Sequence, residues 1–303
     1  MKFKPRVLDL SKISFSMINQ YLRCPRQFMY HYVQGKSEPP GIALIEGSAH
    51  HAALEYNNHH KRKHGRDLRD SVITEKFVEE LRTKVKEDKV KYEEESENAL
   101  IERGGIWHKK YMREFAPTIE PDMVEEEFNK EVELNGRPTI VHGYIDLGYS
   151  RRVADYKTTS SYGFSQKKRA IDHDLQLSFY SWATGRSKVE QICLIKGNIP
   201  EVKNIQSTRS EGQLRYALRI AEQVMDAVER GAFPMCSPDQ WNCSKLYCGF
   251  YSQCRGKIEG VANYGNNARL CGIKNYKKGY GNSGGGERTS HYRKPSDSLP
   301  GGF

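Results

Sequence analysis

Apolar residues at helical spacing dominate the first 115 positions of the chain. In segment 14–33 they follow Ser14 or Ser16, either of which can cap a helix, and they are Ile18, Tyr21, Leu22, Phe28 and Tyr32. Segment 46–64 has a similar pattern, 72–95 is a long, highly charged amphipathic stretch, and 100–115 is another amphipathic segment. The spacing predicts four helices over these ranges.

The hydrophobic period changes to two at Met123. Three alternating stretches follow, VEEEFNKEVEL, TIVHGYIDLGYS and RRVADYKTT, and Asn135–Gly136 forms a turn signal between the first two. This pattern predicts consecutive antiparallel strands. A helix over 173–183, a strand at QICLIKG and an amphipathic helix over 211–230 complete a mixed α/β domain without internal repeats.

The charge of the chain indicates a polyanionic partner. The net charge is +10, and half of it lies in 261–303, where seven basic residues face two acidic ones. This basicity indicates nucleic acid as the binding partner. The alternative is that the positive charge only keeps the protein soluble. The same segment is rich in Gly and Ser and predicts a disordered tail, whose interleaved tyrosines and cations suit either base stacking or solubility.

The sequence argues against a membrane-spanning or secreted protein. The chain has no run of about eighteen apolar residues, and MKFKPRVLDLSKISFS lacks the apolar stretch of a signal peptide. Seven cysteines are an odd number for a disulfide framework. We therefore expect a cytoplasmic protein, in a bacterium or in the host of a phage.

Two carboxylates and a lysine stand out among the strands. Asp146 interrupts the apolar run GYIDL, and Asp155 and Lys157 are two apart, so they project from one face of a strand. Paired carboxylates beside a lysine suit a hard divalent cation and a phosphate to be attacked. An ordinary Asp–Lys salt bridge on a solvent-facing strand is the alternative.

Two helices offer further site candidates. His51, with Glu55 one turn later, could add an imidazole to carboxylate ligands of Mn²⁺ or Mg²⁺, although His50 beside it makes the choice ambiguous. Gln176 and Tyr180 share a helix face and could hydrogen-bond a phosphate backbone or the lysine. Each is also compatible with an ordinary structural role.

Cysteines cluster near the end of the predicted domain. Cys243, Cys248 and Cys254 lie within WNCSKLYCGFYSQC, a spacing that favours metal ligation over redox pairing. The cluster needs a fourth thiolate, for which Cys24 in its Cys-Pro context is the candidate. Cys236 could substitute for one ligand.

In order, the motifs GxxxHxxLE, GYID, DYKT and QxxxY resemble the RecB-like branch of the PD-(D/E)XK nucleases. They span Gly47 to Glu55, Gly143 to Asp146, Asp155 to Lys157 and Gln176 to Tyr180, and SFSMINQYLRCPRQFMYHY is similar to the N-terminal helix of that branch. The branch includes the nuclease domains of recombination helicases, CRISPR-associated adaptation exonucleases and phage exonucleases. The resemblance covers roughly residues 11–256.

The resemblance implies a set of roles at the site. Asp146, Asp155 and Lys157 would be catalytic, and the metal ligands would be His51, Asp146, Asp155 and the Tyr156 backbone carbonyl. Gln176 and Tyr180 would complete the site and hold the DNA strand. Glu55 would either support His51 or pack the helix.

The same resemblance implies a cofactor at the cysteines. Some members of the branch carry one cysteine before the nuclease motifs and three after them, ligating a 4Fe-4S cluster. Cys24, Cys243, Cys248 and Cys254 match this layout, with Zn²⁺ as the rival metal. Cys193 reads as a core residue, and Cys271 in the tail has no partner that we can identify.

The expected fold is therefore a restriction-endonuclease-like α/β core over 1–260, with a central mixed sheet flanked by helices. The core would carry a helical insertion over about 61–115. An iron–sulfur clamp, with its cysteine cluster at 243–254, would join the N-terminal helix to the C-terminal segment, and the tail 261–303 would follow. The expected function is that of a Mg²⁺- or Mn²⁺-dependent DNA exonuclease in recombination, repair or phage DNA processing, acting on DNA ends or single strands. Two alternatives remain open: a nucleic-acid-binding or assembly protein that does not cut, and a structure-specific endonuclease in a recombination complex. Recombination or replication proteins and further copies of the chain are candidate partners.

Overall fold

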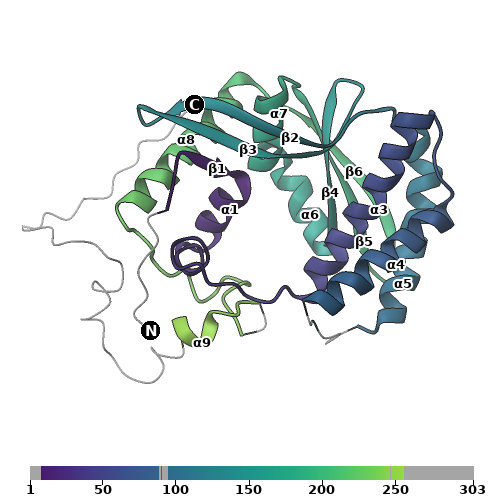
Figure 1. Ribbon diagram of the computed structural model, residues 1–303, viewed down its shortest axis with the longest axis horizontal. Helices are drawn as coiled ribbons and strands as arrows, with labels where there is room; N and C mark the ends of the chain where they lie inside the picture. Colours follow the sequence, from purple (N-terminus) through teal and green to yellow (C-terminus); the bar gives the residue numbers. More distant parts are fainter. Residues whose placement is uncertain (1–7, 89, 91–94, 246, 256–303) are drawn as a thin grey trace, which may run out of the picture.

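The computed structural model describes residues 8–88, 90, 95–245 and 247–255. A six-stranded mixed sheet forms its centre, with the order β1-β3-β4-β5-β6 and with β2 paired to β3 (Figure 1). The strands are β1 (Lys12–Ser14), β2 (Pro121–Leu134), β3 (Arg137–Tyr149), β4 (Arg152–Ser160), β5 (Lys188–Lys196) and β6 (Glu201–Thr208). The α/β class, the mixed sheet and the antiparallel β2–β3–β4 order are thus confirmed.

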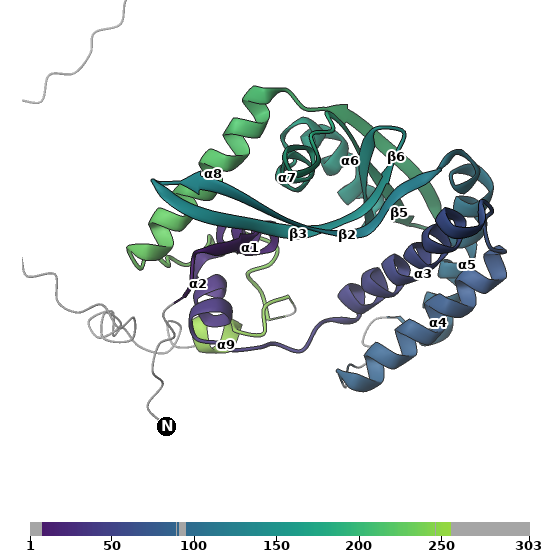
Figure 2. The ribbon, with the colours of Figure 1, turned by 45° about the horizontal axis from the view of Figure 1, so that its top comes forward.

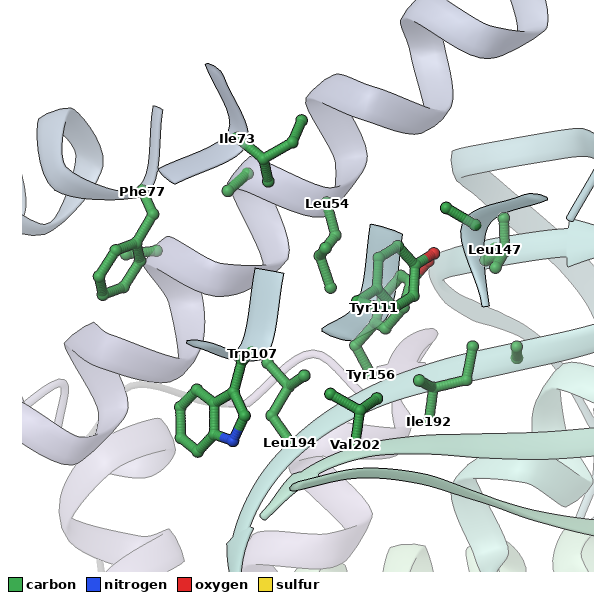
Figure 3. Close-up of a cluster of buried hydrophobic side chains, with 14 of the residues drawn as sticks. Leu54, Ile73, Phe77, Trp107, Tyr111, Leu147, Tyr156, Ile192, Leu194 and Val202 are labelled. Carbon is green, nitrogen blue, oxygen red and sulfur yellow. The ribbon is translucent and has the colours of Figure 1, made fainter. Parts of the chain in front are cut away.

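One face of the sheet is covered by α3 (Ile42–His64), α4 (Asp70–Glu87) and α5 (Glu97–Glu114). Figure 3 shows the core beneath them, in which Trp107 and Tyr111 of α5 pack toward Tyr156 and Leu194 of the sheet. Trp107 and Tyr111 are fully buried, and burying such large aromatic side chains contributes strongly to stability. This helical layer therefore fixes α3, which carries His51, against β4.

The other face is covered by α6 (Ser161–Ala170) and α7 (Leu175–Thr184), which lie opposite α3 in Figure 2. Leu177 and Tyr180 of α7 pack there against Ile145 and Cys193. A separate cluster joins α1 (Phe15–Arg23) and α8 (Glu211–Glu229) to the β2–β3 hairpin. The predicted helix over 211–230 and the core position of Cys193 are confirmed.

Several element predictions need correction. Segment 14–33 is not one helix, because Cys24 has an extended backbone before Pro25, where proline disfavours the helical region. It divides into α1, α2 (Pro25–Phe28) and the π-helical turn η1 (Met29–Val33). The helix predicted over 72–95 ends at Glu87, and residues 89 and 91–94 lie outside the described part.

Three elements were missed by the sequence patterns. Strand β1 is short, β6 is only partly buried, and α6 has no buried residue, so none of them shows a clear apolar period. The remaining short elements are η2 (Ala116–Thr118), η3 (Ile171–His173) and α9 (Tyr251–Cys254). The predicted tail, with Cys271 and its tyrosines, lies outside the described residues.

No helix in the described part of the chain is long and apolar enough to cross a membrane.

Candidate active site

The two strand carboxylates lie where β3 and β4 separate. These strands pair only from Leu147–Ala154 to Tyr149–Arg152, so Asp146 and Asp155 each stand one residue beyond the last pair. The gap is bridged by the backbone amide of Tyr156, which donates to Asp146 Oδ2 at 3.0 Å. Beyond this point β4 continues beside β5. The fork therefore holds both carboxylates next to each other while leaving an opening between the strands.

Helix α3 brings His51 to this fork. Its Nε2 lies 2.7 Å from the Tyr156 carbonyl oxygen, and its Nδ1 lies 3.3 Å from Asp146 Oδ2. Gly47, one turn earlier, permits the approach, since a Cβ there would lie 3.2 Å from the Thr158 hydroxyl oxygen. The structure thus places His51, Asp146 and the Tyr156 carbonyl together, as the sequence motifs led us to expect.

Glu125 joins this group, although the sequence patterns did not indicate it. Its carboxylate oxygen, a His51 ring nitrogen and an Asp146 oxygen all lie within 4.8 Å of one another. Glu125 has φ 44°, in the left-handed region that is costly for a side chain other than glycine. This conformation lies in β2 opposite the fork, where it directs the carboxylate toward Asp146. The sequence does show three acids in the run VEEEF, but the alternation of apolar and polar positions does not indicate which of them faces the fork.

The charges around Glu125 favour the binding of a cation. Burial, together with the neighbouring charges of Asp146, Glu55 and Asp155, raises the pKa of Glu125 to about 7. Carboxylates held together in this way repel one another unless a positive charge lies between them. An imidazole, two carboxylates and a backbone carbonyl form a donor set that suits Mn²⁺ or Mg²⁺. An open pocket of about 570 Å³ adjoins the group.

Asp155 is more deeply buried than Asp146 and faces the other side of the fork. One of its oxygens, Oδ1, accepts from Lys157 Nζ at 2.8 Å, while Oδ2 is buried without a hydrogen-bond partner. Burial raises the pKa of Asp155, and Lys157 opposes that rise. Asp155 is not part of the compact group around His51, but its free oxygen leaves it able to contribute a ligand.

Lys157 belongs to a chain of hydrogen bonds that runs through α7. Its Nζ donates to Gln176 Oε1 at 2.9 Å, Gln176 Nε2 donates to the Tyr180 hydroxyl at 2.8 Å, and that hydroxyl donates to Asp146 Oδ1 at 3.3 Å. Burial lowers the pKa of Lys157, but Asp155 and Asp146 outweigh burial and leave it raised. Lys157 is therefore held as a charged ammonium beside both carboxylates.

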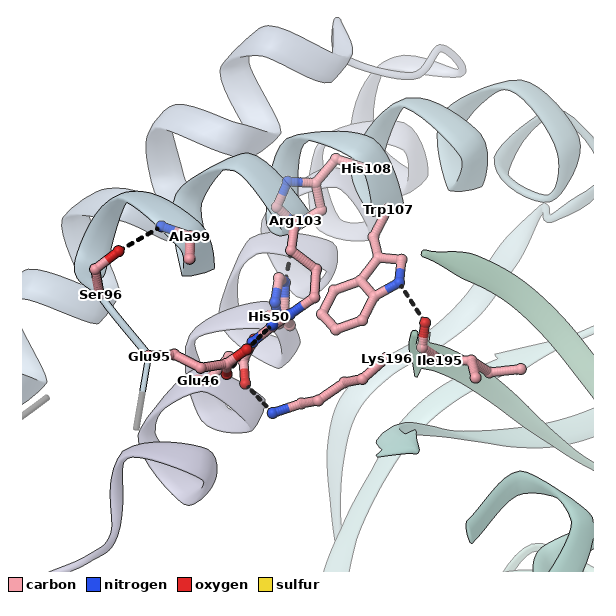
Figure 4. A network of polar contacts seen from close by, with 10 residues as sticks. All are labelled: Glu46, His50, Glu95, Ser96, Ala99, Arg103, Trp107, His108, Ile195 and Lys196. Atoms are coloured by element: carbon pink, nitrogen blue, oxygen red, sulfur yellow. Dashed lines mark hydrogen bonds and ion pairs between the residues drawn. The ribbon is translucent and has the colours of Figure 1, made fainter. Parts of the chain in front are cut away.

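A buried polar network fixes α3 behind the site (Figure 4). Glu46 pairs with Arg103 of α5 and with Lys196 at the end of β5, and Trp107 donates to the Ile195 carbonyl at 3.2 Å. His50 lies within this layer, fully buried and stacked on Phe77 at 4.0 Å between ring centroids. His50 thus faces away from the carboxylates, which settles the ambiguity between His50 and His51. Breaking a buried ion pair is strongly destabilising, so this network holds the helix in register.

Glu55 lines the same pocket as His51 and Glu125, and its carboxylate lies 3.4 Å from His59 Nε2. Within the described residues it forms no hydrogen bond or ion pair with His51, so its role as a support of His51 or in helix packing stays a prediction.

Five cysteines, from the N-terminal and the C-terminal parts of the described chain, lie around one pocket. They are Cys24, Cys236, Cys243, Cys248 and Cys254, and they line it together with Tyr30, Phe250 and Arg255. Each of the five is a free thiol, and Cys24 is buried. These cysteines lie close enough to affect one another: burial and the neighbouring Cys24 and Cys243 raise the pKa of Cys236 to about 12. Cys24 at the start of α2 is thus brought to the C-terminal thiols despite more than two hundred intervening residues.

The sulfurs do not form one compact group. Cys236 is hydrogen-bonded to both Cys24 and Cys243, while among the described residues no three cysteine sulfurs all lie within 4.8 Å of one another. Clustered thiolates of this kind suit either zinc or an iron–sulfur cluster.

Comparison with known proteins agrees with the site. The model of the PD-(D/E)XK nuclease superfamily matches residues 12–255, and the chain belongs to this superfamily. Its members are nucleases that use divalent metals, and the group around His51 is a candidate site for such a metal. No curated protein sequence matches the chain.

Two solved structures are similar to this chain. One is the crystal structure of SSO0001, with 17% identity, a TM-score of 0.39, and coverage of 83% of this chain and 89% of that one. The other is a protein from Eubacterium rectale that is provisionally described as an exonuclease, with 12% identity, a TM-score of 0.48, and coverage of 87% and 94%. These likenesses are too weak to transfer an activity.

Proposed function

We propose that the protein is a divalent-metal-dependent deoxyribonuclease of the RecB-like branch, and that it degrades DNA from ends. One observation carries the proposal: His51, Glu125, Asp146, Asp155, Lys157, Gln176 and Tyr180, drawn from five different elements, form one connected site. Such convergence of carboxylates, imidazole and ammonium in an open pocket supports phosphodiester hydrolysis better than structural ion pairing.

The residues divide the chemistry between them. His51, Glu125, Asp146 and the Tyr156 carbonyl would hold the divalent cation, with Asp155 Oδ2 as a further ligand. When bound, the cation lowers the pKa of water and neutralises phosphate oxygens. Lys157 presents a fixed positive charge where negative charge develops at the scissile phosphate and can orient the attacking water. Gln176 positions Lys157, and Tyr180 ties Gln176 to Asp146.

We also propose that Cys24, Cys243, Cys248 and Cys254 ligate a 4Fe-4S cluster. The pocket that they line supports this assignment. Bound there, the cluster would join α2 to the segment around α9, closing a long loop around the nuclease core. The nuclease domain would then span 1–260, with 61–115 as a helical insertion, and work in a reducing cytoplasm.

Cleavage assays with defined ends test the function. Anaerobically purified protein is incubated with Mg²⁺ or Mn²⁺ and with 5′-labelled, 3′-labelled and closed circular DNA, single- and double-stranded. We expect metal-dependent loss of linear strands, survival of circles, and loss of activity in Asp155→Ala. Cutting of circles at the same rate would make the enzyme an endonuclease. If folded, metal-loaded protein binds every DNA and cuts none, the non-cutting alternative is correct.

A further inference from the structure

The groove-facing side of α6 is polar and basic instead of apolar. Ser161, Phe164, Ser165, Lys168 and Arg169 line a groove against the β5–β6 hairpin, and their spacing places them on one face of the helix. A helix face turned toward a sheet ordinarily carries apolar residues for burial. Here only Phe164 packs against the core beneath it, while the rest of the face carries two hydroxyls and two cations, and α6 contains no acidic residue. Packing therefore explains Phe164 but not the two cations.

The groove lies on the same side of the sheet as Lys157. Thr159 is two positions beyond Lys157 in β4 and so points the same way, and its register partner in β5 is Ile195, which lines the groove. The rise of a strand places this level about 7 Å from Lys157.

Two of the groove cations, Lys168 and Arg169, are not used by the protein itself. Within the described part of the chain, neither Lys168 nor Arg169 forms an ion pair or a hydrogen bond, and both are exposed. The nearest acid in the groove, Glu201, is already paired with Lys203 at 2.9 Å. Two unpaired cations beside serine hydroxyls form a binding surface for phosphate groups.

We propose that this α6 groove binds the sugar–phosphate backbone of the DNA strand that enters the active site, with Lys168 and Arg169 each neutralising one phosphate. The proposal rests on the deoxyribonuclease function and extends it, because it names the surface that guides the strand to Lys157. The contacts are to the backbone, so they position the strand without selecting a sequence.

The salt dependence of DNA binding tests the groove. A fluorescently labelled oligonucleotide is titrated in EDTA, which prevents cutting, at several salt concentrations, with unmodified protein and with Lys168→Gln/Arg169→Gln. Loss of two phosphate contacts lowers the slope of log K against log salt by about 1.4 for a single strand or about 1.8 for a duplex. At low salt, affinity falls on the order of tenfold to a hundredfold. In cleavage assays, KM rises while kcat is retained.

A matched pair of variants controls for net charge. Lys63 and Arg66 are exposed at the far end of α3, about 18 Å along the helix from His51 at Lys63. Lys63→Gln/Arg66→Gln removes the same charge and should leave the salt slope unchanged, while Lys168→Arg/Arg169→Lys should retain it. Equal slopes for the α6 variant and the unmodified protein would overturn the groove proposal even if the enzyme cuts DNA. Conversely, a salt-sensitive groove in a protein that never cuts would leave the groove standing and remove the deoxyribonuclease function.

Discussion

Lys157 and Gln176 are 19 positions apart in the chain, yet the Lys157 ammonium donates to the Gln176 side-chain oxygen at 2.9 Å. The same ammonium donates to Asp155 at 2.8 Å, so its position is set from both β4 and α7. Tyr180 extends the contact from Gln176 to Asp146. The lysine is thereby held at a defined point between two carboxylates before any substrate arrives.

Removal of Lys157 should abolish cleavage without abolishing DNA binding. We expect Lys157→Ala to lower kcat on the order of 10²–10³-fold, the cost of losing one group aimed at developing charge. Gln176→Ala should lower kcat by on the order of tenfold, because it removes a hydrogen bond to a charged group. Single-turnover cleavage and binding in EDTA measure the two effects separately.

Lys188→Ala is the control for this pair, since Lys188 is an exposed cation at the start of β5. It should cleave like the unmodified protein. Wild-type rates in Lys157→Ala would show that the ammonium has no part in the reaction.

Replacement of Glu125 should weaken metal binding. We expect Glu125→Gln to bind Mn²⁺ at least tenfold more weakly in calorimetry without DNA, because one of two clustered carboxylate charges is lost. In EDTA the variant should unfold at the same or a higher temperature, since charge repulsion at the buried site is relieved. Glu127→Gln, at an exposed position of the same strand, is the control. Unchanged Mn²⁺ affinity in Glu125→Gln would remove this residue from the ligand set.

Glu125 also shows where sequence reasoning reached its limit. Asp155 and Lys157 could be placed on one face because a strand alternates strictly, and Gln176 and Tyr180 because a helix returns after four residues. Glu125 lies between Val124 and Glu126, which pair with Leu147 and Ile145, so it stands opposite Asp146. This pairing and the positive φ of Glu125 are features in space that no side-chain period encodes. The divergence of β3 from β4 after Leu147 and Ala154 is likewise a property of pairing in space.

The fold was predictable to a similar extent. The long helices and the β2–β3–β4 order followed from strong hydrophobic periods, which are set by burial of one face. The break at Cys24–Pro25 could not be predicted in this way, because the apolar spacing continues across the proline. Helix α6 could not be predicted either, because a helix without buried residues has no apolar period. The omission of α6 is instructive, since its polarity is the feature that the groove proposal uses.

The cysteine pocket gives a prediction about metal content. Anaerobically purified protein should contain about four iron atoms and as much acid-labile sulfide per chain, with brown visible absorbance. Cys24→Ser should lose both and unfold at a lower temperature, because the link from α2 to the C-terminal segment is broken. Cys193→Ala, in the core away from this pocket, should keep its iron. Stoichiometric zinc in colourless protein would replace the cluster assignment with a zinc site.

The last prediction concerns two buried histidines. The Thr74 hydroxyl donates to the Asp70 carbonyl at 2.9 Å, so it accepts from His108 Nδ1 at 3.0 Å. His108 Nε2 is then an acceptor for the His50 Nδ1–H at 3.1 Å, which fixes both rings as neutral tautomers (Figure 4). Burial lowers the pKa of His108 to about 3, and protonation would place two N–H groups against each other.

The neutral pair makes stability fall in acid. Between about pH 6.5 and 3 the unfolded chain binds a proton at His108 that the folded chain does not bind, so the free energy of unfolding decreases as pH falls. The full contribution of one such group is about 1.4 kcal/mol per pH unit. Urea unfolding at pH 7.5, 6.5, 5.5 and 4.5 should show a slope to which both His50 and His108 contribute, because burial lowers the pKa of each. His108→Gln should lower that slope by the share of His108, about 1.4 kcal/mol per pH unit, whatever its absolute stability. His59→Gln, at an exposed position, should retain the slope of the unmodified protein. If His108→Gln retains that slope as well, His108 is charged in the folded protein and the tautomer assignment is wrong.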